Sequence, residues 1–151
     1  MLVLRRYRSL DQEPVWELHN LALSQTGAHG GNGPWDDDLR HIEDIYLRDG
    51  EFIVGMIEDR IVAMGALKHT SAERAEIKRM RVHPDYQDKG YGQQVLVYLE
   101  NRARELGFKV LHLDTTDKQE AAQKLYLKNG YQEIERKQWR SMTMIFYEKG
   151  L

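Results

Sequence analysis

The feature that most constrains this chain is the stretch at residues 80–96, MRVHPDYQDKGYGQQVL. It predicts the end of a strand, a turn, a glycine-bearing loop and then the first turns of an amphipathic helix. Such a junction aims several backbone N–H groups at one point, at the positive end of a helix dipole. Gly90 and Gly92 remove side chains where an anion would approach the backbone, and no Ser, Thr or Asn stands at Gly90 as a cap. The stretch therefore predicts a site for an anion such as a pyrophosphate.

The glycines alone do not say which phosphate-bearing ligand the loop takes, because glycine pairs at strand–helix junctions are common by chance. The segment at residues 87–92, QDKGYG, lacks the Gly-Lys-Ser/Thr end of a Walker loop. It also lacks the third glycine of the dinucleotide fingerprint. The remaining motifs have to decide the ligand.

The periodicity of the whole chain predicts a mixed sheet covered by helices. Alternating or continuous apolar runs indicate strands at residues 2–7, 51–57, 60–68, 75–82, 109–113, 131–137 and 141–148. Helical spacing indicates helices at residues 11–24, 36–46, 91–106 and 119–128. The strand–helix–strand unit at residues 75–113 is expected to form a right-handed parallel crossover, and the hairpins around it are expected to be antiparallel. We expect one α/β (α+β) domain over residues 1–151, with a mostly antiparallel sheet of about seven strands and about four helices.

The strand that leads into the loop carries an irregularity. Ala75 and Ile77 share one parity, whereas Met80 and Val82 share the other, and a regular strand cannot place all four on one face. A β-bulge near residues 78–79 would bring the four side chains to one face. The alternative is that both faces of this strand are covered.

Composition excludes several classes of function. The formal net charge of −2 leaves no basic surplus of the kind that a general nucleic-acid or anionic-membrane binder carries. Without cysteine there is no disulfide, thiolate metal site or cysteine nucleophile, and the six histidines stand singly, without ligand spacing. No apolar run approaches the roughly 20 residues of a membrane span, and the N-terminal MLVLRRYR is charged too early for a signal peptide. We expect a cytoplasmic protein that binds no metal, nucleic acid or membrane.

From residue 75 to residue 131 the chain resembles the GNAT superfamily of acyl-CoA-dependent N-acetyltransferases. The family's signature loop, Arg/Gln-x-x-Gly-x-Gly/Ala, is matched by Gln87, Gly90 and Gly92. The segment EIKRMRVHP at residues 76–84 is similar to its central strand. The segment AQKLYLKNGY at residues 122–131 is similar to its later Ala-x-x-Leu-Tyr-x-x-x-Gly-Phe/Tyr pattern. Three motifs in the right order make this resemblance specific.

The resemblance implies acetyl-CoA as cosubstrate, bound where two parallel strands splay apart, here those that end at Val82 and Leu113. The strand backbone would pair with the pantetheine, the amides at residues 87–93 would hold the pyrophosphate, and Lys89 would add charge. The cofactor-binding residues implied are Met80, Arg81, Val82, Gln87, Asp88, Lys89, Gly90, Tyr91, Gly92, Gln93, Gln119 and Tyr126. Three of these depart from the usual pattern: Gln119 replaces an Asn, Gln87 replaces an Arg, and Asp88 adds a negative charge.

The reaction implied is direct attack of a primary amine on the thioester in a ternary complex. The departing thiolate must gain a proton, and Tyr126 matches the family's proton donor. The alternative is that Tyr126 is only a core residue. Glu76 stands where some members place the base; with an ordinary pKa of about 4.3 it would need a water relay or a raised pKa. The alternative for Glu76 is a strand-edge carboxylate paired to residues 78–79.

The acceptor is left open by the sequence, as a small molecule or a peptide or protein amine. In the family the region of residues 29–35 shapes the acceptor site, and Trp35 fits either a substrate contact or a staple against the next helix. The acids at residues 36–38, together with Glu43 and Asp44, fit a solvated helix face better than a charged surface that draws a cationic amine toward the cleft. The C-terminal strands, with Trp139, Met142, Met144 and Phe146, fit a core better than the face of a homodimer. The rivals to an acetyltransferase are a non-catalytic acyl-CoA-binding module and an unrelated enzyme that binds a phosphate ligand.

Overall fold

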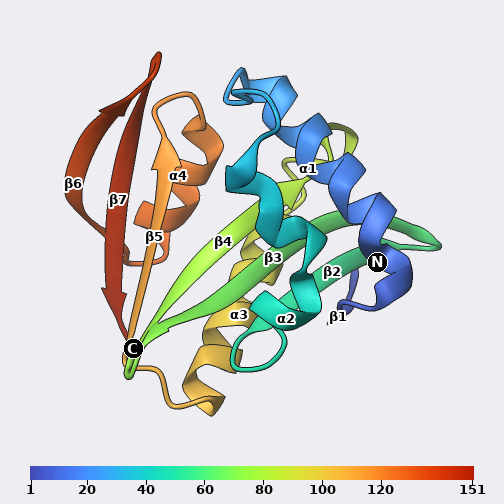
Figure 1. The fold of residues 1–151 in the computed structure, drawn as a ribbon, viewed down its shortest axis with the longest axis horizontal. Coiled ribbons are helices and arrows are strands. Elements are labelled where there is room, and N and C mark those ends of the chain that lie inside the picture. The colour runs from blue at the N-terminus through green and yellow to red at the C-terminus, as the bar shows by residue number, and fades with distance from the viewer.

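The computed structural model describes residues 1–151, which form one seven-stranded sheet with the strand order β1-β2-β3-β4-β5-β7-β6 (Figure 1). The strands are β1 (Val3–Arg6), β2 (Glu51–Ile57), β3 (Arg60–Ser71), β4 (Arg74–Val82), β5 (Val110–Thr116), β6 (Gln132–Trp139) and β7 (Met142–Gly150). The α-helices are α1 (Gln12–Thr26), α2 (Ile42–Ile45), α3 (Tyr91–Glu105) and α4 (Glu120–Lys128). Three 3₁₀ helices, η1 (Ser9–Asp11), η2 (Pro34–Arg40) and η3 (Pro84–Tyr86), complete the elements. The fold class expected from the sequence is confirmed.

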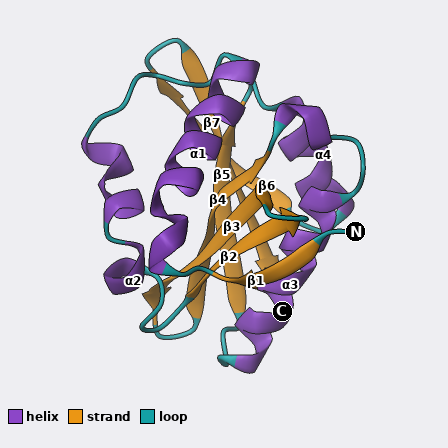
Figure 2. Cartoon of the chain, turned by 90° about the vertical axis from the view of Figure 1, so that its right-hand side faces the viewer, coloured by secondary structure: helices purple, strands orange, loops and turns teal.

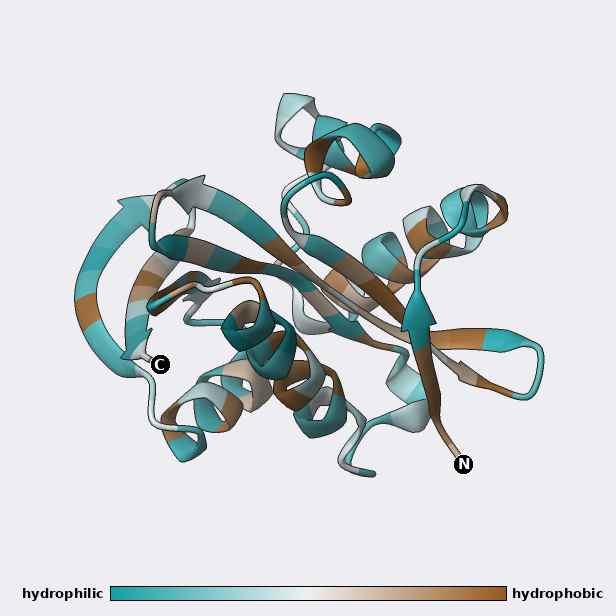
Figure 3. Ribbon diagram, turned by 90° about the horizontal axis from the view of Figure 1, so that it is seen from below, coloured by the Kyte–Doolittle hydropathy of each residue, from teal (hydrophilic) through white to brown (hydrophobic).

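Helices cover both faces of the sheet (Figure 2). Helices α1 and α2 lie on one face, where they enclose a cluster that includes Val15, Leu39 and Phe52. Helices α3 and α4 lie on the other face, over a larger cluster that includes Leu99 and Tyr126. Both clusters arise because apolar side chains recur at helical spacing opposite strand residues that alternate in direction. The edge strand β6, on the left of Figure 3, is hydrophilic along most of its length and exposed throughout.

The parallel pair β4–β5 is short, and this opens the sheet. Pairing is confined to Arg74–Glu76 of β4 with Val110–His112 of β5. Beyond these residues β4 continues to Val82 against β3, while β5 continues to Thr116 against β7. The two strands therefore separate toward their carboxyl ends, as the splayed pair expected from the sequence does. No helix of the protein combines the length and apolar character needed to span a membrane.

The bulge expected in β4 is confirmed, one position further along the chain. Met64 pairs with Arg81 and Ala66 pairs with Lys78, so one β3 residue faces two β4 residues, Arg79 and Met80. The backbone of Arg79 takes φ = 58°, in the left-handed region that an L-residue adopts only at a cost. Because of the extra residue, Ala75, Ile77, Met80 and Val82 all pack against the same core under α3 and α4.

Three expected elements differ from the structure, and one of them is β3, which runs to Ser71 although its end was expected at residue 68. The single helix expected at residues 36–46 is divided into η2 and α2 at His41, whose backbone leaves helical geometry with φ = −137° and ψ = 42°. The tighter winding of η2 places Asp36 and Leu39, three residues apart, on one buried side. Strand β5 extends three residues beyond its expected end because β7 pairs with it up to Thr116.

Candidate active site

Two adjoining cavities meet where β4 and β5 separate. The sheet cavity, of about 570 Å³, lies over the diverging strands between the loop at residues 28–36 and strands β6 and β7. The loop cavity, of about 440 Å³, lies between residues 86–93 and helix α4. The residues that line both cavities, which we call the throat, are Met80, Arg81, Gln119, Ala122 and Tyr126. A ligand that passes from one cavity to the other must contact these side chains.

The loop cavity contains the uncapped helix end that the sequence predicts. Gly90 is the N-cap of α3 with φ = 81°, and no side chain makes a capping hydrogen bond there. A Cβ atom on Gly92 would lie 3.5 Å from Leu125 and 3.8 Å from Val82. Because glycine has no Cβ atom, the cavity is wider at this point. The first amides of α3 are therefore free to bind an anion at the positive end of the helix dipole.

Most of the predicted cofactor residues line these two cavities, with one exception. The throat holds Met80, Arg81, Gln119 and Tyr126, and the loop cavity is also lined by Val82, Gln87, Asp88, Gly90, Tyr91, Gly92 and Gln93. Lys89 is exposed and lies outside both cavity walls. Lys124 and Lys128, one turn apart on α4, line the loop cavity instead. The sequence analysis missed these lysines, although their i, i+4 spacing beside Tyr126 is a readable signal.

The side chains of two predicted residues, Gln87 and Gln119, form hydrogen bonds that connect neighbouring parts of the cavity walls. Gln87 donates to the Val82 carbonyl at 3.1 Å and forms a reciprocal amide pair with Gln25 of α1. Gln119 accepts through Oε1 from the hydroxyls of Thr115 and Thr116 at 3.2 and 3.1 Å. These bonds occupy neither the Gln87 backbone N–H nor the Gln119 amide nitrogen. Both donors therefore remain available to a ligand.

Tyr126 is both a core residue and a throat residue. Its ring packs edge-on against Tyr131 at 5.7 Å and lies 6.1 Å from Tyr147, and only 4% of the residue is exposed. Its hydroxyl makes no hydrogen bond within the protein. Burial and Asp114 raise the pKa of the phenol, and the positive charge of Arg81 partly opposes them. The hydroxyl is therefore protonated at neutral pH and faces the passage between the cavities.

Two carboxylates from the neighbouring parallel strands line the sheet cavity without an ion-pair partner: Glu76 of β4 and Asp114 of β5. The expected alternative for Glu76, a pair with Lys78 or Arg79, does not form, because Arg79 binds other acids. Asp114 is exposed to solvent on one side, but partial desolvation by the cleft wall and the charge of Glu76 raise its pKa, and the charge of Lys78 partly opposes them. Sequence reasoning missed Asp114, since its proximity to Glu76 depends on the parallel pairing.

Arg79, at the bulge, joins β4 to the 3₁₀ helix η2. Its guanidinium donates to both carboxylate oxygens of Asp38, at 2.5 and 3.0 Å, and to the Trp35 carbonyl at 2.6 Å. Asp36 lies 3.5 Å from the same guanidinium, and Tyr46 donates its hydroxyl to Asp38. The expectation of a solvated acidic face is therefore wrong for Asp36 and Asp38, which point inward because a buried arginine needs their charge.

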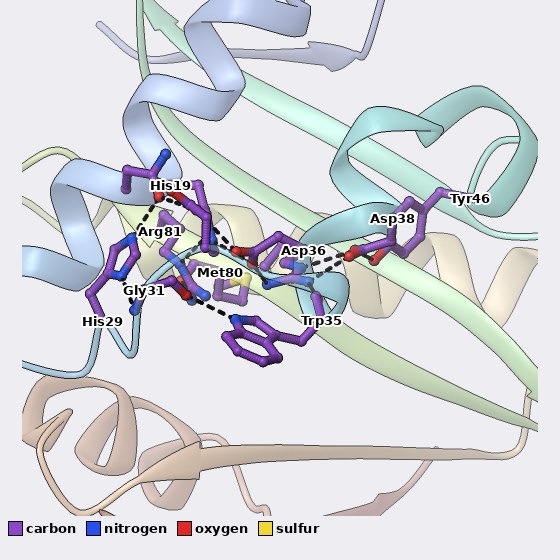
Figure 4. A network of polar contacts seen from close by, with 12 residues as sticks. His19, His29, Gly31, Trp35, Asp36, Asp38, Tyr46, Met80 and Arg81 are labelled. Carbon is purple, nitrogen blue, oxygen red and sulfur yellow. Dashed lines mark hydrogen bonds and ion pairs between the residues drawn. The ribbon is translucent and has the colours of Figure 1, made fainter.

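The network continues through a buried histidine of α1 (Figure 4). His19 Nε2 lies 3.0 Å from Asp36 Oδ1, and its Nδ1 accepts from Arg81 Nε at 3.4 Å. Burial, with the positive charges of Arg81 and Arg79, lowers the pKa of His19 to about 3. His19 is therefore neutral at physiological pH, with the proton on Nε2 toward Asp36.

This buried histidine is expected to make the protein less stable in mild acid. In the unfolded chain His19 has a pKa near 6.5, so the unfolded state binds a proton below that pH. The folded state does not bind this proton until the pH falls to about 3. The free energy of unfolding should fall by about 2 kcal/mol between pH 7.5 and pH 5 on this account. Urea denaturation of the wild type and of His19→Gln at both pH values checks it. An equal pH dependence in the two proteins would contradict the assignment.

Two tryptophans and an arginine bridge the mouth of the sheet cavity. Trp35 and Trp139 meet edge to face with ring centroids 5.9 Å apart, and the Arg140 guanidinium lies 4.8 Å from each ring. Arg140 also donates to the Gly30 carbonyl at 3.0 Å. Trp35 is thus a cavity-lining aromatic residue. For Trp139 the core assignment is wrong, because 38% of it is exposed at the end of the edge strand β6.

The fold and the cavities define a single α/β domain that admits a ligand between two splayed parallel strands, beside an uncapped helix N-terminus. The sequence profile of the Acetyltransferase (GNAT) family matches residues 13–131, and the chain belongs to this family. No group of three or more His, Cys, Asp or Glu side chains is placed to hold a metal ion.

Curated relatives match part of the chain. It is 35% identical over 79 residues to YsnE, an uncharacterised N-acetyltransferase of Bacillus subtilis strain 168, covering 51% of this chain and 52% of the relative. It is 33% identical over 87 residues to the aminoalkylphosphonate N-acetyltransferase of Salmonella typhimurium, covering 58% of this chain and 54% of the relative. The matches span about half the length of these relatives.

Solved structures match nearly the whole chain. A GNAT-family acetyltransferase of Staphylococcus aureus Mu50 gives a TM-score of 0.90 at 22% identity, covering 99% of both chains. The putative acetyltransferase yncA of Salmonella typhimurium, solved with acetyl-CoA, gives a TM-score of 0.81 at 19% identity, covering 99% of this chain and 94% of the other. The PaiA N-acetyltransferase of Thermoplasma acidophilum, in complex with coenzyme A, gives a TM-score of 0.79 at 18% identity, covering 100% of this chain and 99% of the other. At such identities the likeness establishes the fold.

Proposed function

We propose that this protein transfers the acetyl group of acetyl-CoA to a primary amine of a small molecule or of a peptide or protein. The observation that carries the proposal is the place of the Tyr126 hydroxyl, free of protein partners, between a cavity with open helix amides and a cavity with two unpaired carboxylates. Two solved relatives of the same fold hold acetyl-CoA or coenzyme A, and one curated relative is named for an aminoalkylphosphonate acceptor.

The loop cavity has the donors that acetyl-CoA would need. The free amides at the start of α3 suit the pyrophosphate, and Lys124 and Lys128 add positive charge from α4. The pantetheine would run along β4 toward the throat, where the Gln119 amide nitrogen is free to donate. The Met80 carbonyl already accepts from Arg81 Nη1 at 2.8 Å, and its second lone pair remains open.

Transfer in a ternary complex requires proton movements at the nitrogen and at the sulfur, and the cleft has a group for each. Before attack the ammonium would give one proton to Glu76 or Asp114, directly or through water, and the raised pKa of Asp114 makes it a better base than an ordinary aspartate. As the amine then attacks the thioester carbonyl, a C–N bond forms and the C–S bond breaks. Tyr126 would give its proton to the departing thiolate and regain one from the attacking nitrogen, which loses its second proton to become an amide. An acyl-cysteine intermediate is excluded, because the chain has no cysteine.

We expect the purified protein to release free thiol from acetyl-CoA when supplied with at least one class of primary amine. The assay pairs a panel of small amines and lysine-bearing peptides with a thiol reagent, and mass spectrometry of the product confirms an added acetyl group. The trimethylated form of each active amine is the matched control, since it has no proton to lose and should release no thiol.

The rival function, a non-catalytic acyl-CoA-binding module, gives a different pattern in the same experiment. Acetyl-CoA would bind by calorimetry, yet no amine in the panel would raise thiol release above the rate without amine. If acetyl-CoA does not bind at all while another nucleotide does, the protein uses a different phosphate ligand and the proposal is overturned.

A further inference from the structure

Arg81 is the only cation of the throat. Its side chain points to the face of the sheet that helix α1 covers, and the sheet cavity lies on the same face. Its neighbours Met80 and Val82 pack against the core under α3 and α4, so alternation along the strand sends Arg81 the other way. Its hydrogen bonds agree with this direction, since Nε donates to His19 of α1 at 3.4 Å and Nη1 donates to its neighbour's carbonyl. Neither partner carries a negative charge.

The carboxylates near Arg81 are already engaged by other groups. Asp36 is bound by His19 and Asn32 and lies beside Arg79, and Asp38 forms the two-pronged pair with Arg79. Arg81 itself forms no ion pair with either. Burial and the repulsion of Arg79 lower the pKa of Arg81 to about 10, against the opposing attraction of Tyr126, Asp36 and Asp38. The guanidinium stays charged at neutral pH, although no carboxylate forms an ion pair with it.

An arginine in this state is stabilised by an anion that enters the cavity. The pyrophosphate of acetyl-CoA is expected at the first amides of α3, which begins at Tyr91 beyond the 3₁₀ helix η3, whereas Arg81 lines the loop cavity only at the throat. The sheet cavity, by contrast, also holds the unpaired Glu76 and Asp114, which suit an ammonium group. A molecule with one positive and one negative end therefore fits this cavity better than a simple cation.

We propose that Arg81 binds an anionic group of the acceptor, so that the acceptor is a small primary amine with a carboxylate, phosphonate or phosphate a few atoms from its nitrogen. This inference rests on the proposed acetyltransferase function. The guanidinium fork matches such oxyanions with two parallel N–H···O bonds. Held there, the anion would place the amine between Arg81 and the carboxylates, next to the throat.

The test compares acceptors of matched length, 3-aminopropanoate and 2-aminoethylphosphonate against propylamine and ethanolamine. In the wild type kcat/KM should be at least about 10-fold higher for the anionic pair, from one charge-assisted contact. Arg81→Met should reduce this preference about 10- to 100-fold, chiefly through KM, and Arg81→Lys should restore part of it. Lys68→Met, which removes a cation of β3 that lines neither cavity, is the matched control and should keep the preference.

Binding measurements separate this inference from the proposed function. Calorimetry should show that Arg81→Met weakens 2-aminoethylphosphonate binding far more than it weakens acetyl-CoA binding, with circular dichroism confirming the fold. Equal use of neutral and anionic amines by the wild type would overturn the anion site but leave the acetyltransferase intact. A loss confined to acetyl-CoA binding would assign Arg81 to the cofactor instead, and thiol release with no amine at all would overturn the proposed function.

Discussion

Replacing Tyr126 by Phe is expected to lower kcat for acetyl transfer by about 100-fold or more, while the dissociation constant of acetyl-CoA changes less than about threefold. The change removes one oxygen that has no hydrogen-bond partner in the protein and leaves a ring of the same shape in the core. The thiolate would then depart without a proton donor. Steady-state rates and calorimetric binding of acetyl-CoA, measured on the same preparations, check both halves of the expectation.

The matched control for this substitution is Tyr147→Phe. Tyr147 is buried, touches the Tyr126 ring and forms no hydrogen bond through its hydroxyl, but it does not line the throat. Removing that hydroxyl should leave kcat within about twofold, since no proton transfer depends on it. If Tyr126→Phe keeps wild-type turnover, Tyr126 is only a core residue and another group, or water, protonates the sulfur.

Replacing Asp38 by Ala is expected to cost about 3 kcal/mol of folding free energy and about 10 °C in Tm. The substitution leaves the Arg79 guanidinium, whose side chain is 11% exposed, with only the more distant Asp36 as counter-ion. It also removes the acceptor of the Tyr46 hydroxyl, a residue with no exposed surface. Both losses leave buried polar groups without a partner, and this costs more free energy than the loss of the contact alone. Chemical denaturation at neutral pH measures the change.

Asp44→Ala is the matched control, because it breaks an aspartate–arginine pair of ordinary geometry on the surface. Asp44 lies 3.1 Å from Arg48, but the two side chains are 70% and 75% exposed, so water replaces the lost partner. Its cost should stay below about 0.5 kcal/mol. Comparable losses in the two variants would show that the bulge does not depend on the Arg79–Asp38 pair.

The glycine loop and the loop cavity beside it could be predicted because the signals for them are local. The loop at residues 87–92 and the helix after it were read from a few consecutive residues, and the uncapped Gly90 was found as expected. The bulge was likewise visible in the sequence, since the parity change between Ile77 and Met80 lies within one strand. Tyr126 was assigned from its motif, and the structure places it at the throat.

The contacts around the sheet cavity were mostly unpredictable because they join residues far apart in the chain. His19 and Arg81 are separated by 62 positions and Arg79 and Asp38 by 41, so no local pattern connects them. The same long-range bonds explain why the acids before His41 turn inward and why the expected helix there divides. Asp114 lies near Glu76 only because β5 runs parallel to β4.

The family, the class of sheet and the uncapped glycine loop around Gly90 could be predicted from the sequence, because each depends on backbone preferences and periodicity that neighbouring residues set. Which charges remain unpaired in the cleft could not be predicted before the packed fold was known. Whether Arg81, Glu76 and Asp114 are free to meet a ligand depends on which other side chains have already bound the surrounding charges. That competition is resolved only when the helices and the splayed strands are packed together.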